Sequence, residues 1–125
     1  MMGDFMVRTL VAFAFLVVAT VARADVLTLS STYNAAGTNP DGSKYTGTVS
    51  IKVISEKTFT IHWKIGDETY DGFGMRNGDA LAATYTLDGK PGLVIYRLGD
   101  GGTLNGFWVV RGENDGGTER LTPGD

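Results

Sequence analysis

The feature that most constrains the fold is a strict alternation of apolar and polar residues that begins after Lys57. Apolar side chains occupy every second position of this stretch: Phe59, Ile61, Trp63 and Ile65. Successive side chains of a β-strand point to opposite faces, so this pattern buries one face and exposes the other. Gly66-Asp67 then predicts a tight turn into a second strand, Thr69–Met75. We therefore predict a β-hairpin that serves as the template for an antiparallel domain.

Six further segments alternate in a similar way or are short apolar runs, and we predict strands at Val26–Tyr33, Tyr45–Val53, Leu81–Leu87, Leu93–Leu98, Leu104–Val110 and Thr118–Thr122. Segments rich in glycine, aspartate and asparagine separate them, the longest being Asn34–Ser43. Short connections make sequence neighbours into sheet neighbours. The sequence predicts an all-β domain, a single antiparallel up-and-down meander of about eight strands that closes into a small β-barrel. A two-sheet sandwich is the alternative.

The first 24 residues have the pattern of an export signal. Arg8 precedes an apolar run, Leu10–Val21, and Ala22-Arg23-Ala24 stands where a signal peptidase site is expected. The run is shorter than the roughly 20 residues of a membrane-spanning helix, although a retained anchor is the alternative. We predict a signal peptide over residues 1–24 and a β-barrel domain over 25–125, exported to the periplasm or secreted, with no membrane insertion after cleavage.

Charge and cysteine content exclude several classes of function. Without residues 1–24, nine Lys/Arg oppose thirteen Asp/Glu, a net charge of −4. Nucleic acid and anionic membranes are poor partners for such a surface. An inhibitor of a basic cell-wall hydrolase is a further hypothesis that rests on this charge alone. The absence of cysteine excludes disulfides, thiolate metal sites and thiol nucleophiles.

The sequence offers little for catalysis. His62 is the single histidine and lies on the polar face of its strand. Most aspartates lie in or beside glycine turns, where they bond their own backbone, and they do not reach the spacing of a calcium loop. We therefore predict a protein that is not an enzyme and has no metal and no cofactor.

Aromatic residues gather on the predicted inner face. The alternation places there Tyr33, Trp63, Tyr70, Tyr85 and Trp108, and Tyr96 lies in a strand that is apolar on both faces. Aromatic rings fill small cores well, so plain packing is one interpretation. The other is a cavity for a small apolar or aromatic ligand, as in a carrier of lipocalin or avidin architecture, and this rests on fold analogy.

Two strands, Leu93–Leu98 and Leu104–Val110, are apolar on both faces. Their outward side chains are predicted to be Leu93, Ile95, Phe107 and Val109. Exposed apolar patches mark interaction surfaces. We predict that these four residues contact another protein or a second copy in a homodimer.

Several segments resemble small exported bacterial proteins labelled fibronectin-binding proteins: Gly37–Thr48, Met75–Asn77, Gly92–Tyr96, Gly102–Gly106 with Trp108, and Gly117–Glu119 with Leu121–Pro123. The resemblance covers nearly all of residues 25–125. It implies an exported, non-enzymatic interaction module that binds a host matrix protein such as fibronectin. The small-ligand carrier is the alternative.

Overall fold

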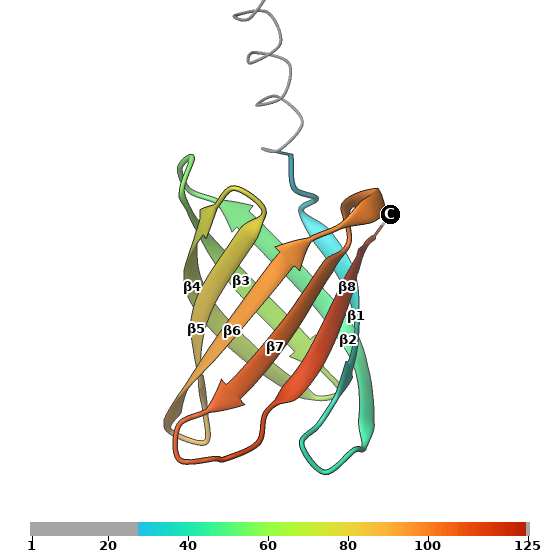
Figure 1. Ribbon diagram of the computed structural model, residues 1–125, viewed down its shortest axis with the longest axis vertical. Coiled ribbons are helices and arrows are strands. Elements are labelled where there is room, and N and C mark those ends of the chain that lie inside the picture. Colours follow the sequence, from blue (N-terminus) through green and yellow to red (C-terminus); the bar gives the residue numbers. More distant parts are fainter. Residues whose placement is uncertain (1–27, 125) are drawn as a thin grey trace, which may run out of the picture.

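Alternating side chains build eight strands, and each pairs with the next in an antiparallel ladder (Figure 1). The computed structural model describes residues 28–124. The strands are β1 (Thr32–Thr38), β2 (Lys44–Val53), β3 (Thr58–Ile65), β4 (Glu68–Asn77), β5 (Ala80–Leu87), β6 (Lys90–Leu98), β7 (Leu104–Val110) and β8 (Gly117–Pro123). A 3₁₀ turn, η1 (Asp100–Gly102), precedes β7. The ladder closes because β1 also pairs with β8. The predicted all-β meander and its closure into a barrel are confirmed.

The predicted signal peptide, residues 1–24, lies outside the described residues. So do the first two residues of the strand predicted at Val26–Tyr33. Between residues 28 and 124, no helix is both long enough and apolar enough to cross a membrane.

The first strand is the one element whose predicted position was wrong. We predicted it over Val26–Tyr33 and expected a turn over Asn34–Ser43, but β1 covers Thr32–Thr38. The turn itself is short, with Asn39 N–H donating to Ser43 O at 2.7 Å and Gly42 N–H to Asn39 O at 2.9 Å. Pairing with β2 on one side and β8 on the other outweighs the low strand propensity of this alanine- and glycine-rich segment.

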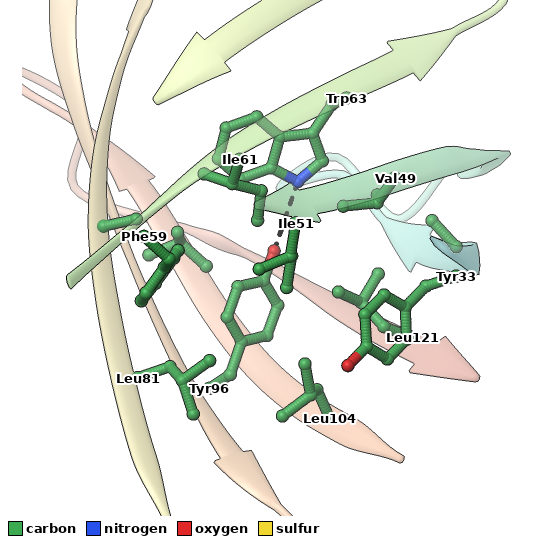
Figure 2. Close-up of a cluster of buried hydrophobic side chains, with 13 residues drawn as sticks. Tyr33, Val49, Ile51, Phe59, Ile61, Trp63, Leu81, Tyr96, Leu104 and Leu121 are labelled. Atoms are coloured by element: carbon green, nitrogen blue, oxygen red, sulfur yellow. Dashed lines mark hydrogen bonds between the residues drawn. The ribbon is translucent and has the colours of Figure 1, made fainter. Parts of the chain in front are cut away.

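The barrel interior has two different ends. At what we call the filled end, the turns 54–57, 78–79 and 99–103 and the start of β1 surround an apolar core (top of Figure 1; Figure 2). Its largest fully buried side chains are Tyr33, Phe59, Ile61, Leu81, Leu104 and Leu121. At the other, which we call the cavity end, lie the turns 39–43, 66–67, 88–89 and 111–116.

Large aromatic rings lie over glycines of the neighbouring strand. The register pairs five inward glycines directly with an aromatic residue: Gly37 with Tyr45, Gly74 with Phe59, Gly92 with Tyr85, Gly106 with Tyr96, and Gly117 with Trp108. A Cβ added at Gly106 would lie 2.5 Å from Cδ1 of Tyr96, and the other four would collide with their rings as closely. The rings therefore lie against the barrel wall, and at the cavity end the centre stays open.

Candidate functional site

A cavity of about 150 Å³ occupies the cavity end of the barrel. Every strand from β2 to β8 contributes to its wall, and Asn39, which directly follows β1, completes it. The lining residues are Asn39, Tyr45, Trp63, Ile65, Tyr70, Tyr85, Leu87, Val94, Tyr96, Trp108 and Glu119. Aromatic rings make up most of this wall, and no lysine, arginine or histidine belongs to it.

Glu119 is the polar centre of the cavity. It extends inward from β8 with only 5% of its surface exposed, and it is the one buried charged residue of the described chain. Three donors from three other strands converge on its carboxylate. Tyr45 Oη donates to Oε1 at 2.9 Å, and Tyr96 Oη donates to Oε2 at 2.5 Å. Trp63 Nε1 donates to Oε2 at 3.1 Å and lies 3.2 Å from Tyr96 Oη, the contact drawn in Figure 2.

The geometry around Glu119 is that of a hydrogen-bonded carboxylate. An indole N–H only donates, and an O–H···O distance near 2.5 Å is typical of a bond to an ionised acceptor. Hydrogen bonds of this kind offset much of the cost of burying a charge. Glu119 therefore joins β2, β3, β6 and β8 through one group.

The tyrosines around Glu119 keep their protons. Burial raises the pKa of Tyr96 well above its ordinary value, and the nearby charge of Glu119 raises it further. The pKa of Tyr45 is raised for the same two reasons, burial first. Burial followed by the charge of Glu119 raises the pKa of Tyr85 to about 12. These hydroxyls act as neutral hydrogen-bond donors rather than as acids or bases.

Trp108 brings an unused donor to the cavity. Its indole N–H is buried and has no hydrogen-bond acceptor among residues 28–124. Burial is the main cause of the raised pKa of the Tyr45 hydroxyl, and the nearby Trp108 indole acts in the opposite direction, although no hydrogen bond of good geometry forms between them. The two rings meet edge to face, 6.5 Å apart. Trp63 and Tyr85 pack in the same manner, with their centroids 5.6 Å apart.

All five aromatic residues predicted to line an interior site do line this cavity: Trp63, Tyr70, Tyr85, Tyr96 and Trp108. Tyr96, which the sequence left ambiguous, points inward and is almost fully buried. Tyr70 lies nearer the mouth, where its hydroxyl donates to Glu68 at 3.0 Å. Tyr33, also placed on the inner face, belongs instead to the filled end, and its hydroxyl accepts from Ser30 N–H at 2.9 Å.

Sequence reasoning missed the carboxylate and one of its partners. Glu119 shares the inward face of its strand with Gly117 and Leu121, so the period of two would have placed it inside. Tyr45 stands at the start of β2 on the inward side. Glu119 was not selected because we interpreted the charged residues as turn or surface residues. Tyr45 was not selected although the alternation of its strand places it on the inward side.

The four residues predicted as an interface all lie on the outside of the barrel. Leu93, Ile95, Phe107 and Val109 are 36–70% exposed, and we refer to them with Phe73 and Met75 of β4 as the outer apolar face. The register places them in two rows across β4 to β7, with only Ala82 and Thr84 of β5 between.

His62 lies on the outer surface, as its strand position predicts, and its Nδ1 is 2.6 Å from Oδ1 of the exposed Asp71. Among the described residues, no group of three histidine, aspartate or glutamate side chains could hold a metal ion.

Comparison with known proteins identifies the fold and no family. No protein-family model and no curated protein sequence matches the chain, so the fibronectin-binding name has no support from either search. Among solved structures, a redesigned β-barrel is 19% identical with a TM-score of 0.63, covering 78% of this chain and 92% of that one. A de novo designed fluorescence-activating β-barrel is 14% identical with a TM-score of 0.61, covering 79% and 96%. A barrel bound to DFHBI is 18% identical with a TM-score of 0.56, covering 81% and 96%.

Proposed function

We propose that this barrel is a non-enzymatic carrier that holds a small aromatic or apolar molecule in its cavity end. The observation that supports it is a cavity of about 150 Å³ walled by aromatic rings and containing a few convergent polar groups. Ligand sites combine apolar walls with a small number of such groups. Two of the similar barrels are described as fluorescence-activating and as bound to DFHBI, so this architecture does hold small molecules in other proteins.

The cavity volume limits the size of the ligand. An apolar cavity of roughly 150 Å³ accepts benzene in another protein, whereas sites for drug-sized ligands span about 300–1,000 Å³. We therefore expect one ring, with any further atoms at the open mouth. At a ceiling near −1.5 kcal/mol per atom, about six buried atoms bind no more tightly than roughly micromolar.

The experiment is a binding titration of the protein purified from cells that produce the full chain. Single-ring compounds added to it should change the fluorescence of Trp63 and Trp108, and native mass spectrometry should detect a retained adduct. Leu87→Phe places a ring at the cavity wall and should weaken binding. Its control, Thr86→Phe, adds the same ring on the outer surface of the same strand and should leave binding unchanged. Equal binding by both variants would move the site away from the cavity.

A second candidate function is protein contact through the outer apolar face. A patch of six large apolar residues on adjoining strands is unusual for a surface that stays in water. We propose a partner protein or a second copy on this face. Sedimentation velocity would detect a dimer, and immobilised fibronectin would test the binding that the sequence resemblance implies. Phe107→Asp should weaken either contact, whereas Thr48→Asp, on the exposed side of β2 and outside this face, should not.

We also propose that the protein is exported and cleaved before Asp25. Protein recovered from its own cells should then begin at Asp25 in N-terminal sequencing. A mass that includes residues 1–24 would contradict export by this route.

A further inference from the structure

We infer that the molecule held in the cavity is a small organic cation, an ammonium ion on a body about the size of one ring, bound with its charge at Glu119. The inference rests on the proposed carrier function and specifies its ligand. Three independent features of the cavity support it: a buried carboxylate with no cationic residue in the cavity wall, aromatic faces around it, and a carboxylate-rich rim.

The first feature is the charge of Glu119. All three of its hydrogen-bond partners are neutral groups, Tyr45, Trp63 and Tyr96, and no cationic residue lines the cavity. A buried carboxylate is stabilised most by an opposite charge within a few ångströms, and that position lies in the cavity. A carboxylate accepts about four hydrogen bonds, so one site remains, and the bond count places it on Oε1. A protonated amine would supply both the charge and that bond.

The second feature is the aromatic wall. Rings from six strands surround the space beside Glu119: Tyr45, Trp63, Tyr70, Tyr85, Tyr96 and Trp108. The negative faces of such rings attract cations, and Trp attracts them best. Cages of aromatic residues are a general solution for binding organic ammonium ions. An anion would instead meet both the ring faces and a like charge in a site partly excluded from water.

The third feature is the charge of the turns around the mouth. The four turns at the cavity end contain five carboxylates and one cation: Asp41, Asp67, Asp88, Glu113, Asp115 and Arg111. Lys44, Glu68 and Lys90 at the adjoining strand ends leave the rim acidic. A rim of one sign raises the local concentration of the opposite ion and speeds its entry.

Three probes that carry the same phenyl ring separate the effect of charge from that of shape: benzylammonium, benzyl alcohol and benzoate. Each is titrated calorimetrically into protein purified from cells that produce the full chain. We expect benzylammonium to bind at least about tenfold more tightly than benzyl alcohol, and benzoate to bind more weakly than both. Glu119→Gln keeps the shape and an amide oxygen for Trp63, and it should cost benzylammonium about tenfold while leaving benzyl alcohol within about twofold. Glu56→Gln instead removes an exposed charge in the turn 54–57 at the filled end, and it should leave the affinities of all three probes within about twofold.

Each result of these titrations either supports or contradicts the inference. Equal affinity for benzylammonium and benzyl alcohol in the unaltered protein would overturn the inference and leave the carrier function standing. A preference for the ammonium that survives Glu119→Gln would overturn the role of Glu119. Failure of all three probes to bind would contradict the proposed function together with this inference. The ranking in the unaltered protein needs no variant, so it holds even if Glu119→Gln does not fold.

Discussion

The two ends of this barrel share one backbone pattern and use it for opposite purposes. At the filled end, inward positions carry residues such as Leu81, Leu104 and Leu121, each with 0% of its surface exposed. At the cavity end, the same strands carry aromatic rings and Glu119, and a void of about 150 Å³ remains between them. The difference lies in what each inward side chain does with the space at the barrel axis.

Branched aliphatic side chains project toward the axis and fill it, whereas rings that lie over a glycine stay near the wall. Tyr85 over Gly92 and Trp108 over Gly117 are of the second kind. Their glycines supply the room that the rings occupy, so the axis is left to the carboxylate and the cavity. Stability is therefore expected to reside at the filled end and binding at the cavity end.

The largest expected effect compares one deletion at the two ends. Leu121→Ala removes a side chain packed on every side and should cost about 2–5 kcal/mol of unfolding free energy. Leu87→Ala removes the same atoms from a half-buried position beside the cavity, and we expect less than about 1 kcal/mol. Urea unfolding followed by fluorescence measures both. Equal losses would show that the cavity end carries as much of the stability as the filled end.

A smaller effect is expected from adding a methyl group beneath a ring. Gly74→Ala, at the filled end, would collide with Phe59 and with the backbone oxygen of Ala82, neither of which has room to move. We expect a loss of about 1–3 kcal/mol. At Gly92 the nearest atoms to an added methyl group all belong to the ring of Tyr85, which borders the cavity and has space to move into. The cost of Gly92→Ala should be lower, and the displaced ring should weaken ligand binding. Thermal unfolding of both variants, measured with and without a ligand, tests this contrast.

The two tryptophans give a still smaller contrast at the boundary of the cavity. Trp63→Phe removes a donor from Glu119 and should cost about 1–2 kcal/mol. Trp108→Phe removes an indole N–H that has no acceptor among the described residues, so its cost should come from ring size alone. A loss at Trp108 as large as at Trp63 would mean that its N–H is satisfied in solution.

The sequence predicted the barrel well because the period of two decides both strand and face. Seven of the eight strands fall at or within two or three residues of their predicted limits. β1 was placed too early, because its inward Ala35 and Gly37 carry almost no apolar signal of their own. Their role depends on partners far along the chain, Gly37 making room for Tyr45, and local pattern does not contain that information.

The site was predicted in part for the same reason. Alternation placed Trp63, Tyr70 and Tyr85 on the inner face, and the structure places them in one cavity wall. The volume between them could not be predicted, since it depends on cross-strand pairing of rings with glycines. Glu119 was available to the same reasoning through its neighbour Leu121. We did not select Glu119 because we assigned charged residues to the surface by default.

The smallest expected effect tests whether the two ends are electrically separate. The pKa of Tyr85, raised by burial and then by the charge of Glu119 to about 12, should fall in Glu119→Gln by part of that shift. Tyr33 should be unaffected, because burial is the main cause of its raised pKa and Glu119 is not among the causes. Tyrosine ¹³C NMR titrations resolve the two residues.

The sign of the pH effect follows from the same shift. Below pH 10 Tyr85 is neutral in both the folded and the unfolded chain, and the stability it contributes is intact. As the pH rises from 10 toward 12, the unfolded chain loses this proton while the folded chain retains it, so stability falls with pH. Glu119→Gln lowers the pKa of Tyr85 in the folded chain and so narrows the pH range over which the folded and unfolded chains differ in this proton. The variant should therefore lose less stability between pH 8 and 11 than the unaltered protein. If Tyr33 moved together with Tyr85, the charge at the cavity end would act through the whole interior, and the division between the two ends would be one of packing alone.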